Sequence, residues 1–183
     1  VEGWRAWVKQ HYGDLQTATK AWQGDTAELG AELLTNHTFT DGTTRWTLEA
    51  PKPAEATMAD VPGGGPDGSN CLRAVMTQPG KEAWHFQIHQ TGLDLTEGLT
   101  YTFSFDARAN EDRRITCGTR VDQADWHANG LSTAVGLTDQ WQHFTFPFTA
   151  TRIVPQHTRV SFTLGNIPGT VELANVSLRP GAE

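Results

Sequence analysis

Sulfur-containing residues and tyrosine are scarce in this chain. Of its 183 residues, two are Cys, two are Met and two are Tyr. Two cysteines permit at most one disulfide, so an apolar core has to hold the fold together. Cys71 and Cys117 leave two alternatives, one bridge or two buried thiols. Two buried thiols are favoured, because Cys117 alternates with Ile115 and Thr119 on an expected core face.

Basic charge and long apolar runs are also lacking. The chain has 14 Lys and Arg against 21 Asp and Glu, a formal net charge of −7, and no basic run. Phosphate binding needs clustered Lys and Arg, so nucleic acid and anionic membrane surfaces are not expected partners. No apolar run approaches the roughly 18 residues of a membrane span. With 37% hydrophobic residues, a globular domain with a neutral partner is expected.

Tryptophan, in contrast, is abundant. Seven Trp accompany the two Tyr. Trp presents a large flat apolar face and one N–H donor, so an exposed Trp often marks a binding site. Most of the seven are expected in the core, and Trp46 and Trp141 are interpreted as structural. Trp84 and Trp126 are the candidates for a binding surface, because Trp126 lies in a polar stretch without apolar alternation.

The first 22 residues differ from the rest. Trp4, Trp7, Val8 and Tyr12 recur at the i, i+3, i+4 spacing of one helix face. This predicts a short N-terminal helical segment over residues 1–28. Helices this short are marginal alone and need a packing partner. A single domain over residues 29–183 is expected to follow.

From residue 29 onward the apolar period is two. Residues 101–108, 144–148 and 160–164 each alternate apolar and polar side chains, which predicts half-buried strands. A change of parity near the C-terminus predicts a bulge at Ala174-Asn175. Residues 50–70, rich in Pro and Gly, are expected to form a long irregular loop. Many short strands without intervening helices predict an all-β fold, a β-sandwich of the jelly-roll kind.

Three stretches taken together resemble a known family. The first is Glu32–Trp46 and the second is Trp84–Arg108. The third consists of Leu137–Phe148, Val160–Gly165 and Gly169–Leu178. In this order they are similar to carbohydrate-binding modules of the family 4, 9 and 22 group. They span roughly residues 31–180, and the ordered set is specific where no single motif is. The resemblance implies a β-jelly roll with a sugar-binding cleft on one sheet.

The sequence departs from this group at two positions tied to a structural calcium ion. The group often carries an acidic residue where Thr40 stands and an Asp where Ala174 stands. A hard cation needs several oxygen ligands, so these replacements argue against calcium here. Asp41 and backbone carbonyls leave an alternative set of oxygens. No cofactor is expected.

The N-terminal stretch resembles a different kind of domain. Trp4–Trp22 is similar to a helical stretch in the barrel domains of glycoside hydrolases such as microbial β-galactosidase-like enzymes. The resemblance implies a linked glycoside hydrolase domain. The expected setting is a secreted, extracellular protein, monomeric, with a polysaccharide as its partner.

The resemblance places stacking aromatics at Trp84 and Trp126 and a sugar-contacting polar residue at Gln87. Pyranose faces are patches of C–H groups, so flat aromatic rings bind them by dispersion and removal of water. An amide suits vicinal hydroxyls because it has two donors and an acceptor. Two rings facing across a cleft are expected to clamp one soluble chain, such as xylan or β-glucan.

Further polar candidates share the expected wet face. Arg120 and Asp122 point away from the core face, and either line the cleft or pair with each other. His85 is expected beside Gln87 on a strand. Its distance from His89 would then be roughly 13 Å, too far to share a zinc ion. Position alone adds two weaker candidates, Asn129 and Thr163.

Catalysis by this chain is not expected. A glycosidase needs two carboxylates held about 5–10 Å apart, and no pair of acidic residues stands in such a context. A nucleophile elbow, a phosphate loop and a zinc motif are absent from the sequence. The main alternative to sugar binding is a structural domain that packs on a glycosidase barrel. Exposure of Trp84 and Trp126 distinguishes the two, since the structural role would bury both rings.

Overall fold

The computed structural model describes residues 29–182 together with Lys9. Within these residues the chain forms antiparallel strands and two short 3-10 turns. The strands are β1 (Thr47–Glu49), β2 (Glu55–Val61), β3 (Cys71–Gln78), β4 (Gln87–Leu93), β5 (Thr100–Ala109), β6 (Arg113–Val121), β7 (Ala128–Leu137), β8 (Gln142–Thr149), β9 (Thr158–Thr163) and β10 (Gly169–Pro180). The turns are η1 (Pro66–Gly68) and η2 (Ala83–His85).

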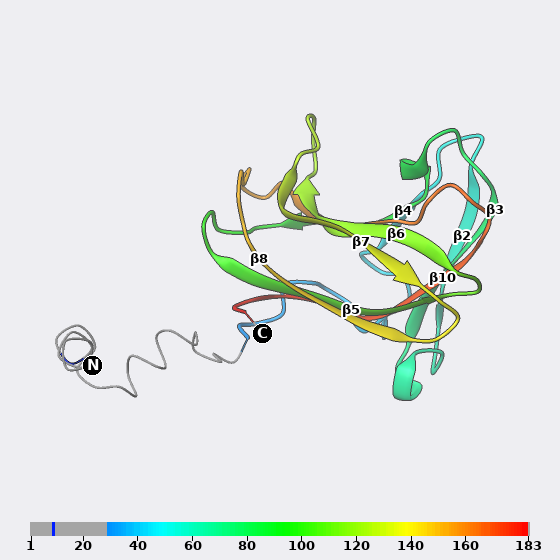
Figure 1. Ribbon diagram of the computed structural model, residues 1–183, viewed down its shortest axis with the longest axis horizontal. Helices are drawn as coiled ribbons and strands as arrows, with labels where there is room; N and C mark the ends of the chain where they lie inside the picture. Colours follow the sequence, from blue (N-terminus) through cyan, green and yellow to red (C-terminus); the bar gives the residue numbers. More distant parts are fainter. Residues whose placement is uncertain (1–8, 10–28, 183) are drawn as a thin grey trace, which may run out of the picture.

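The strands form two five-stranded sheets packed face to face. The first has the order β1-β4-β9-β6-β7 and the second the order β2-β3-β10-β5-β8. Figure 1 shows them as two layers, with β6 and β7 above β5 and β8. The predicted all-β sandwich of the jelly-roll kind is confirmed.

The core lies between the two inner faces, as the alternation predicts. On β5 the side chains of Tyr101, Phe103 and Phe105 are buried. Phe105 meets Phe162 of β9 edge to face, with ring centroids 4.9 Å apart. Aromatic pairs prefer such tilted geometry because the ring edge is positive and the face negative. Aromatic rings from the two inner faces therefore pack together between the sheets. Because side chains alternate along a strand, the positions between these rings point to the outer face, where polar residues lie.

Two predictions about local structure, a bulge near the C-terminus and a loop over residues 50–70, have different outcomes. The predicted bulge is confirmed, because the register of β10 with β5 shifts between Ala174 and Ser177 and Asn175 has a φ of 48°. The irregular loop expected over residues 50–70 is wrong in part. That region contains β2, whose Ala56 and Met58 pack against the core. Prolines and glycines lie on either side of β2, so the alternation of apolar and polar side chains within this short strand was not recognised.

The two predicted structural tryptophans occupy different places. Trp46 is buried, and its indole N–H donates to the Asn36 carbonyl at 3.1 Å. Trp141 is half-buried, with the Arg108 guanidinium 4.8 Å from its ring centroid. Arg108 also pairs with Glu172 on the outer face of the second sheet. Neither ring lines the cleft described below.

The two cysteines are free thiols. Cys117 belongs to the core between the sheets, whereas Cys71 lies near Glu172 and outside the core cluster. Burial raises the pKa of Cys117 to about 12. Burial and the Glu172 carboxylate raise the pKa of Cys71 to about 11. Of the two alternatives, the structure has two buried thiols.

The predicted N-terminal helical segment lies outside the described residues, apart from Lys9. The domain boundary at residue 29 stays a prediction. Gly30 and Leu33 are joined to the C-terminal strand, donating to the carbonyls of Pro180 and Leu178 at 2.7 and 3.0 Å. Within the described part of the chain, no helix is both long and apolar enough to cross a membrane.

Candidate functional site

The outer face of the β1-β4-β9-β6-β7 sheet carries a row of polar side chains. Four consecutive strands contribute one each: Glu49 from β1, Gln87 from β4, Arg159 from β9 and Arg120 from β6. The register aligns Glu49 with Gln87 and Arg120 with Arg159. These four residues form the floor of a cleft.

Two exposed tryptophans form the walls. Trp84 lies in η2, just before β4, and Trp126 lies in the loop after β6. Because β4 and β6 each pair antiparallel with β9, they run in the same direction. The start of β4 and the end of β6 are thus at opposite ends of the strands. The cleft therefore crosses the strands with one ring on each side.

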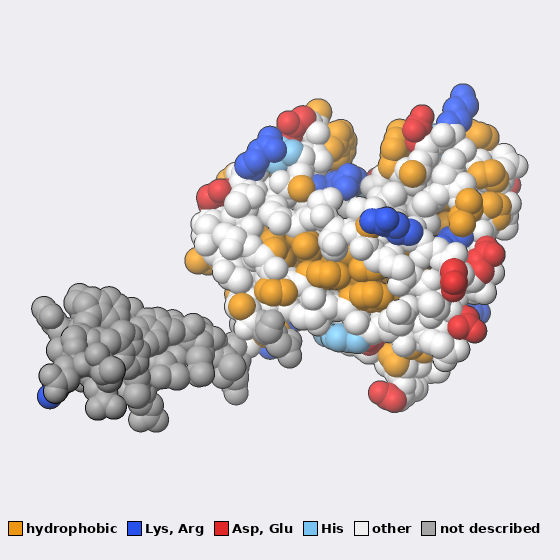
Figure 2. Space-filling model, viewed as in Figure 1, with side chains coloured by type: hydrophobic (Ala, Val, Ile, Leu, Met, Phe, Trp, Pro, Cys, Tyr) orange, Lys and Arg blue, Asp and Glu red, His pale blue; other side chains and the backbone are white. Residues whose placement is uncertain are grey.

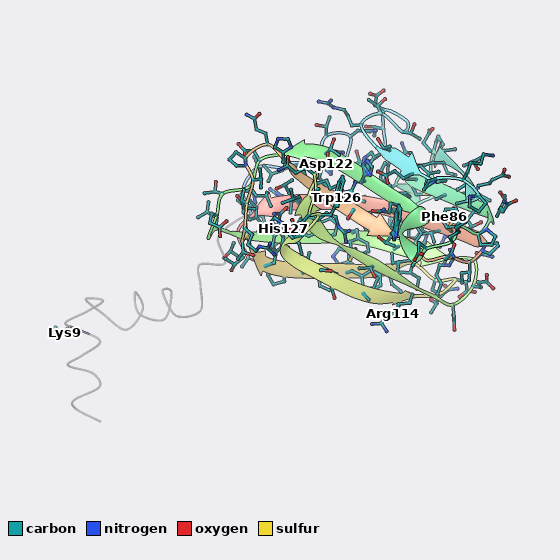
Figure 3. All side chains as sticks on the ribbon, turned by 90° about the horizontal axis from the view of Figure 1, so that it is seen from above. Lys9, Phe86, Arg114, Asp122, Trp126 and His127 are labelled. Carbon is teal, nitrogen blue, oxygen red and sulfur yellow. The ribbon has the colours of Figure 1, made fainter. Side chains whose placement is uncertain are left out.

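The cleft has a volume of about 460 Å³. It is lined by Glu49, Trp84, Gln87, Arg120, Trp126 and Arg159. Figure 2 shows the surface hollowed between two lobes, with hydrophobic side chains on both flanks and basic side chains near the base. Figure 3, which looks down on this sheet, shows Trp126 beside Asp122 and His127, with Phe86, the residue after η2, toward the other end.

The two wall tryptophans are far more exposed than the aromatic residues of the core. Trp84 is 52% exposed and Trp126 is 49% exposed. The ring of Trp84 rests edge-on against His85, with centroids 4.5 Å apart. Exposed apolar rings of this size lose the free energy of burial unless a ligand covers them. Their exposure therefore indicates a contact surface.

Arg159 is the centre of the floor and was not predicted. It is only 4% exposed. Its Nη1 lies 3.4 Å from a carboxylate oxygen of both Glu49 and Asp122, and its guanidinium carbon lies 5.0 Å from the centre of the Trp126 ring. The fixed fork of a guanidinium suits such simultaneous pairing.

Gln87 is held in place from both ends of its amide. Its Nε2 donates to the Trp84 carbonyl at 2.7 Å, and its Oε1 accepts from Arg159 Nη2 at 3.1 Å. The side chain is nearly fully buried, yet it lines the cleft. Gln87 therefore links the η2 wall to the floor.

His89 lies beneath the floor and faces Arg159 and Glu49. Its Nδ1 is 3.4 Å from a Glu49 carboxylate oxygen and 3.5 Å from Arg159 Nη1. Burial, and next the charge of Arg159, lower the pKa of His89. At neutral pH the ring is therefore uncharged, and the charges of the floor are those of Arg159, Arg120 and Glu49.

The loop that carries Trp126 is braced by His127. The His127 Nε2 lies 2.8 Å from the Arg152 carbonyl oxygen, and its Nδ1 contacts the Asp125 carboxylate. The Arg152 carbonyl and the Asp125 side chain raise the pKa of His127. The same hydrogen bond lowers the pKa of Asp125. Trp126 itself has a φ of 59°, in the left-handed region.

Four of the predicted site residues meet in the cleft: Trp84, Gln87, Arg120 and Trp126. Thr163 is opposite Gln87 in the register but is not among the residues that line the cleft. Asp122 pairs with Arg159 rather than with Arg120.

The structure does not bring His85 and Asn129 into the lining. His85 belongs to η2 rather than to the expected strand, so it lies against Trp84 and accepts from the Lys81 N–H at 3.3 Å. Asn129 is fully buried, donates to the Arg152 carbonyl at 3.2 Å and accepts from Thr158. These two residues support the walls.

The positions tied to the family's calcium ion offer few side-chain oxygens in this chain. Ala174 is buried and has no side-chain oxygen. The amide of Asn36 already donates to the carbonyls of Asp41, Gly42 and Thr44 at 3.3, 3.0 and 2.9 Å. Among residues 29–182, no three His, Cys, Asp or Glu side chains cluster as metal ligands.

The lining has one carboxylate, that of Glu49, which is paired with Arg159. Hydrolysis of a glycosidic bond ordinarily takes two carboxylates on either side of the bond. The arrangement of two apolar rings over a polar floor instead suits binding of a ligand with apolar faces and polar edges.

Comparisons with known proteins found a matching family and solved structures of the same fold. The model of a family described as a carbohydrate binding domain matches residues 31–168. Among curated proteins, none matches the chain.

Solved structures share the fold. One described as "CBM4 structure and function" is 25% identical, with a TM-score of 0.70, and the match covers 80% of this chain and 99% of that chain. The N-terminal cellulose-binding domain of Cellulomonas fimi β-1,4-glucanase C is 20% identical over 78% of this chain and 95% of that chain, with a TM-score of 0.54. The CBM22-1–GH10 modules of Clostridium thermocellum xylanase 10B, solved with xylohexaose, are 13% identical over 82% of this chain and 29% of that chain, with a TM-score of 0.59.

Proposed function

Since this chain belongs to the CBM_4_9 family of carbohydrate binding domains, we propose that its cleft binds a soluble β-linked polysaccharide, of the xylan or β-glucan class, without cleaving it. The single observation that carries the proposal is the pair of half-exposed rings, Trp84 and Trp126, on opposite walls of one cleft. Each ring offers an apolar face to the C–H face of a sugar.

The floor supplies the polar half of recognition. Arginine and amide groups donate to sugar hydroxyls, and the Glu49 carboxylate accepts from them. Because Arg159 and Gln87 are fixed by their own partners, they lose little entropy when a ligand binds. An open cleft that crosses the strands suits a single chain better than a crystalline surface.

The proposed role of the module is to concentrate substrate for a linked glycoside hydrolase domain in a secreted, monomeric protein. The N-terminal resemblance supports the linkage, and the xylanase 10B structure combines CBM22-1 and GH10 modules in one protein. We expect millimolar to micromolar affinity, which corresponds to about −4 to −8 kcal/mol.

Affinity electrophoresis tests the proposal. Wild type, Trp84→Ala and Trp126→Ala are run in gels that contain xylan, mixed-linkage β-glucan, laminarin, mannan or galactan. We expect wild type to be retarded in a xylan or β-glucan gel. Loss of either ring should weaken binding by about 2 kcal/mol, roughly 30-fold.

Trp141→Ala is the matched control, because it removes a half-buried indole outside the cleft. It should migrate like wild type. If folded wild type is retarded in none of the gels, the sugar-binding proposal is overturned. The structural accessory role, in which the domain packs on a catalytic barrel, would then take its place.

A further inference from the structure

Arg120 and Arg159 are register partners on neighbouring strands but have different surroundings. Arg159 is paired with Glu49, Asp122 and Gln87. Within residues 29–182, the Arg120 side chain has no hydrogen bond and no ion pair. It nevertheless lines the cleft and is half-buried. The floor therefore holds one guanidinium whose donors are unused.

An unpaired guanidinium in this position is unfavourable in the free protein. Burial, and next the like charge of Arg159, lower the pKa of Arg120. A partly desolvated charge without a partner costs free energy, which an anion in contact with it would recover. A hydroxyl would recover less, because hydrogen bonds between two charged groups are stronger.

The order of the strands places this charge at one end of the cleft. Glu49 is on β1 and Arg120 on β6, three strand spacings apart, or about 14 Å. The paired Arg159 and Gln87 separate them. Among the four floor residues, the acidic group is thus at the β1 end and the unpaired basic group at the β6 end, where the nearby Asp122 carboxylate is paired with Arg159.

We propose that the cleft takes a polysaccharide with carboxylate substituents, such as uronic acid side groups, and that Arg120 binds the carboxylate at the β6 end. The inference rests on the proposed function and adds the substrate class. A guanidinium and a carboxylate match as two parallel N–H···O bonds. The Glu49 carboxylate disfavours the opposite orientation of the chain. The net charge of −7 repels an anionic ligand only weakly. Salt screens charges of the protein that lie more than about 8 Å from the ligand at physiological ionic strength.

Isothermal titration calorimetry with two matched ligand pairs tests the inference. One pair is a glucuronic-acid-substituted xylo-oligosaccharide and the same oligosaccharide with its carboxyl group reduced. The other is a carboxymethylated cello-oligosaccharide and the unsubstituted one. We expect wild type to bind the acidic member of at least one pair roughly tenfold more tightly than the neutral member. The preference should fall as NaCl is raised.

Arg120→Gln should abolish the preference, so that the acidic and neutral members of each pair bind equally, and its urea unfolding midpoint, compared with that of wild type, shows whether the variant is folded. Arg114→Gln is the control, because Arg114 is an exposed arginine of the same strand outside the cleft lining, and it should keep the preference. Equal binding of both members of both pairs, or a preference that survives Arg120→Gln, overturns the inference but not the proposed function. Failure of all four ligands to bind overturns both.

Discussion

The Arg159 guanidinium lies 5.0 Å from the centre of the Trp126 ring and 3.1 Å from the Gln87 amide oxygen. Gln87 in turn donates to the backbone of Trp84. One buried arginine therefore connects the floor to both walls of the cleft. A cation placed over an indole is attracted by the negative face of the ring, so Arg159 also restrains the exposed Trp126.

Arg159→Lys should therefore lower both stability and affinity. Lysine keeps the charge but cannot pair with several partners through a planar fork. We expect the free energy of unfolding to fall by about 1 to 3 kcal/mol and the polysaccharide affinity to fall with it. Urea denaturation and calorimetry measure the two effects. The same change at the exposed Arg114 should alter neither, and an unchanged Arg159→Lys variant would show that the fork is dispensable.

Two substitutions at Trp126 can separate the contribution of its ring to affinity from the cost of its backbone conformation to stability. Its φ of 59° is favourable for glycine and costs other residues about 1 kcal/mol. Trp126→Gly and Trp126→Ala should lose polysaccharide affinity equally, because both lack the ring. The glycine variant should be the more stable of the two, by up to about 1 kcal/mol in thermal or urea unfolding. A less stable glycine variant would contradict the assigned backbone conformation.

Much of the fold was predictable because alternation is a strong signal in half-buried strands. β5, β8 and β9 follow it, and the change of parity at Ala174 located the bulge. β2 was missed because prolines and glycines lie on both sides of a short strand. Its core-facing residues, Ala56 and Met58, are two apolar positions spaced by two. Two positions are too few to identify a strand from the sequence alone.

The walls of the cleft were predictable and its centre was not. Trp126 stands out because a large ring in a polar stretch has no core to join, and Trp84 was indicated by the resemblance to the carbohydrate-binding modules. Arg159 is one charged residue in an alternating strand, on the parity of Thr163, and parity alone would have placed it on the floor. Its partners could not be predicted, because Glu49 and Asp122 are brought to it by the order of the strands.

Gly130 is expected to be essential for the loop that presents Trp126. It has a φ of 115°, and a Cβ there would lie 2.1 Å from the Thr149 carbonyl oxygen. Gly130→Ala should therefore lower the free energy of unfolding by about 2 kcal/mol or more. Gly136 is on the same strand, and a Cβ there would meet nothing within 4 Å. Gly136→Ala should leave the urea midpoint unchanged, and similar midpoints for the two variants would contradict this account.

The brace at His127 should make the affinity depend on pH. Its two ring nitrogens face two acceptors, the Asp125 carboxylate and the Arg152 carbonyl, but a neutral imidazole has only one N–H. The raised pKa of His127 means that its contribution is complete below the ordinary value of 6.5 and is lost as pH rises through the folded value. The lowered pKa of Asp125 means that its contribution is complete above 3.8 and is lost on acidification.

The Trp126 loop should therefore be best ordered between pH 3.8 and pH 6.5. Arg152 Nη2 also faces this pair, 3.7 Å from a carboxylate oxygen of Asp125. Calorimetry with a neutral oligosaccharide from about pH 5 to about pH 9 should show affinity falling as the imidazolium is lost. His127→Gln, whose amide does not titrate, should flatten this profile. His143→Gln, which alters a histidine paired with Asp106 on the other sheet, should keep the profile. A fall that persists in His127→Gln would assign the titration to a different group and remove His127 as the brace of the Trp126 wall.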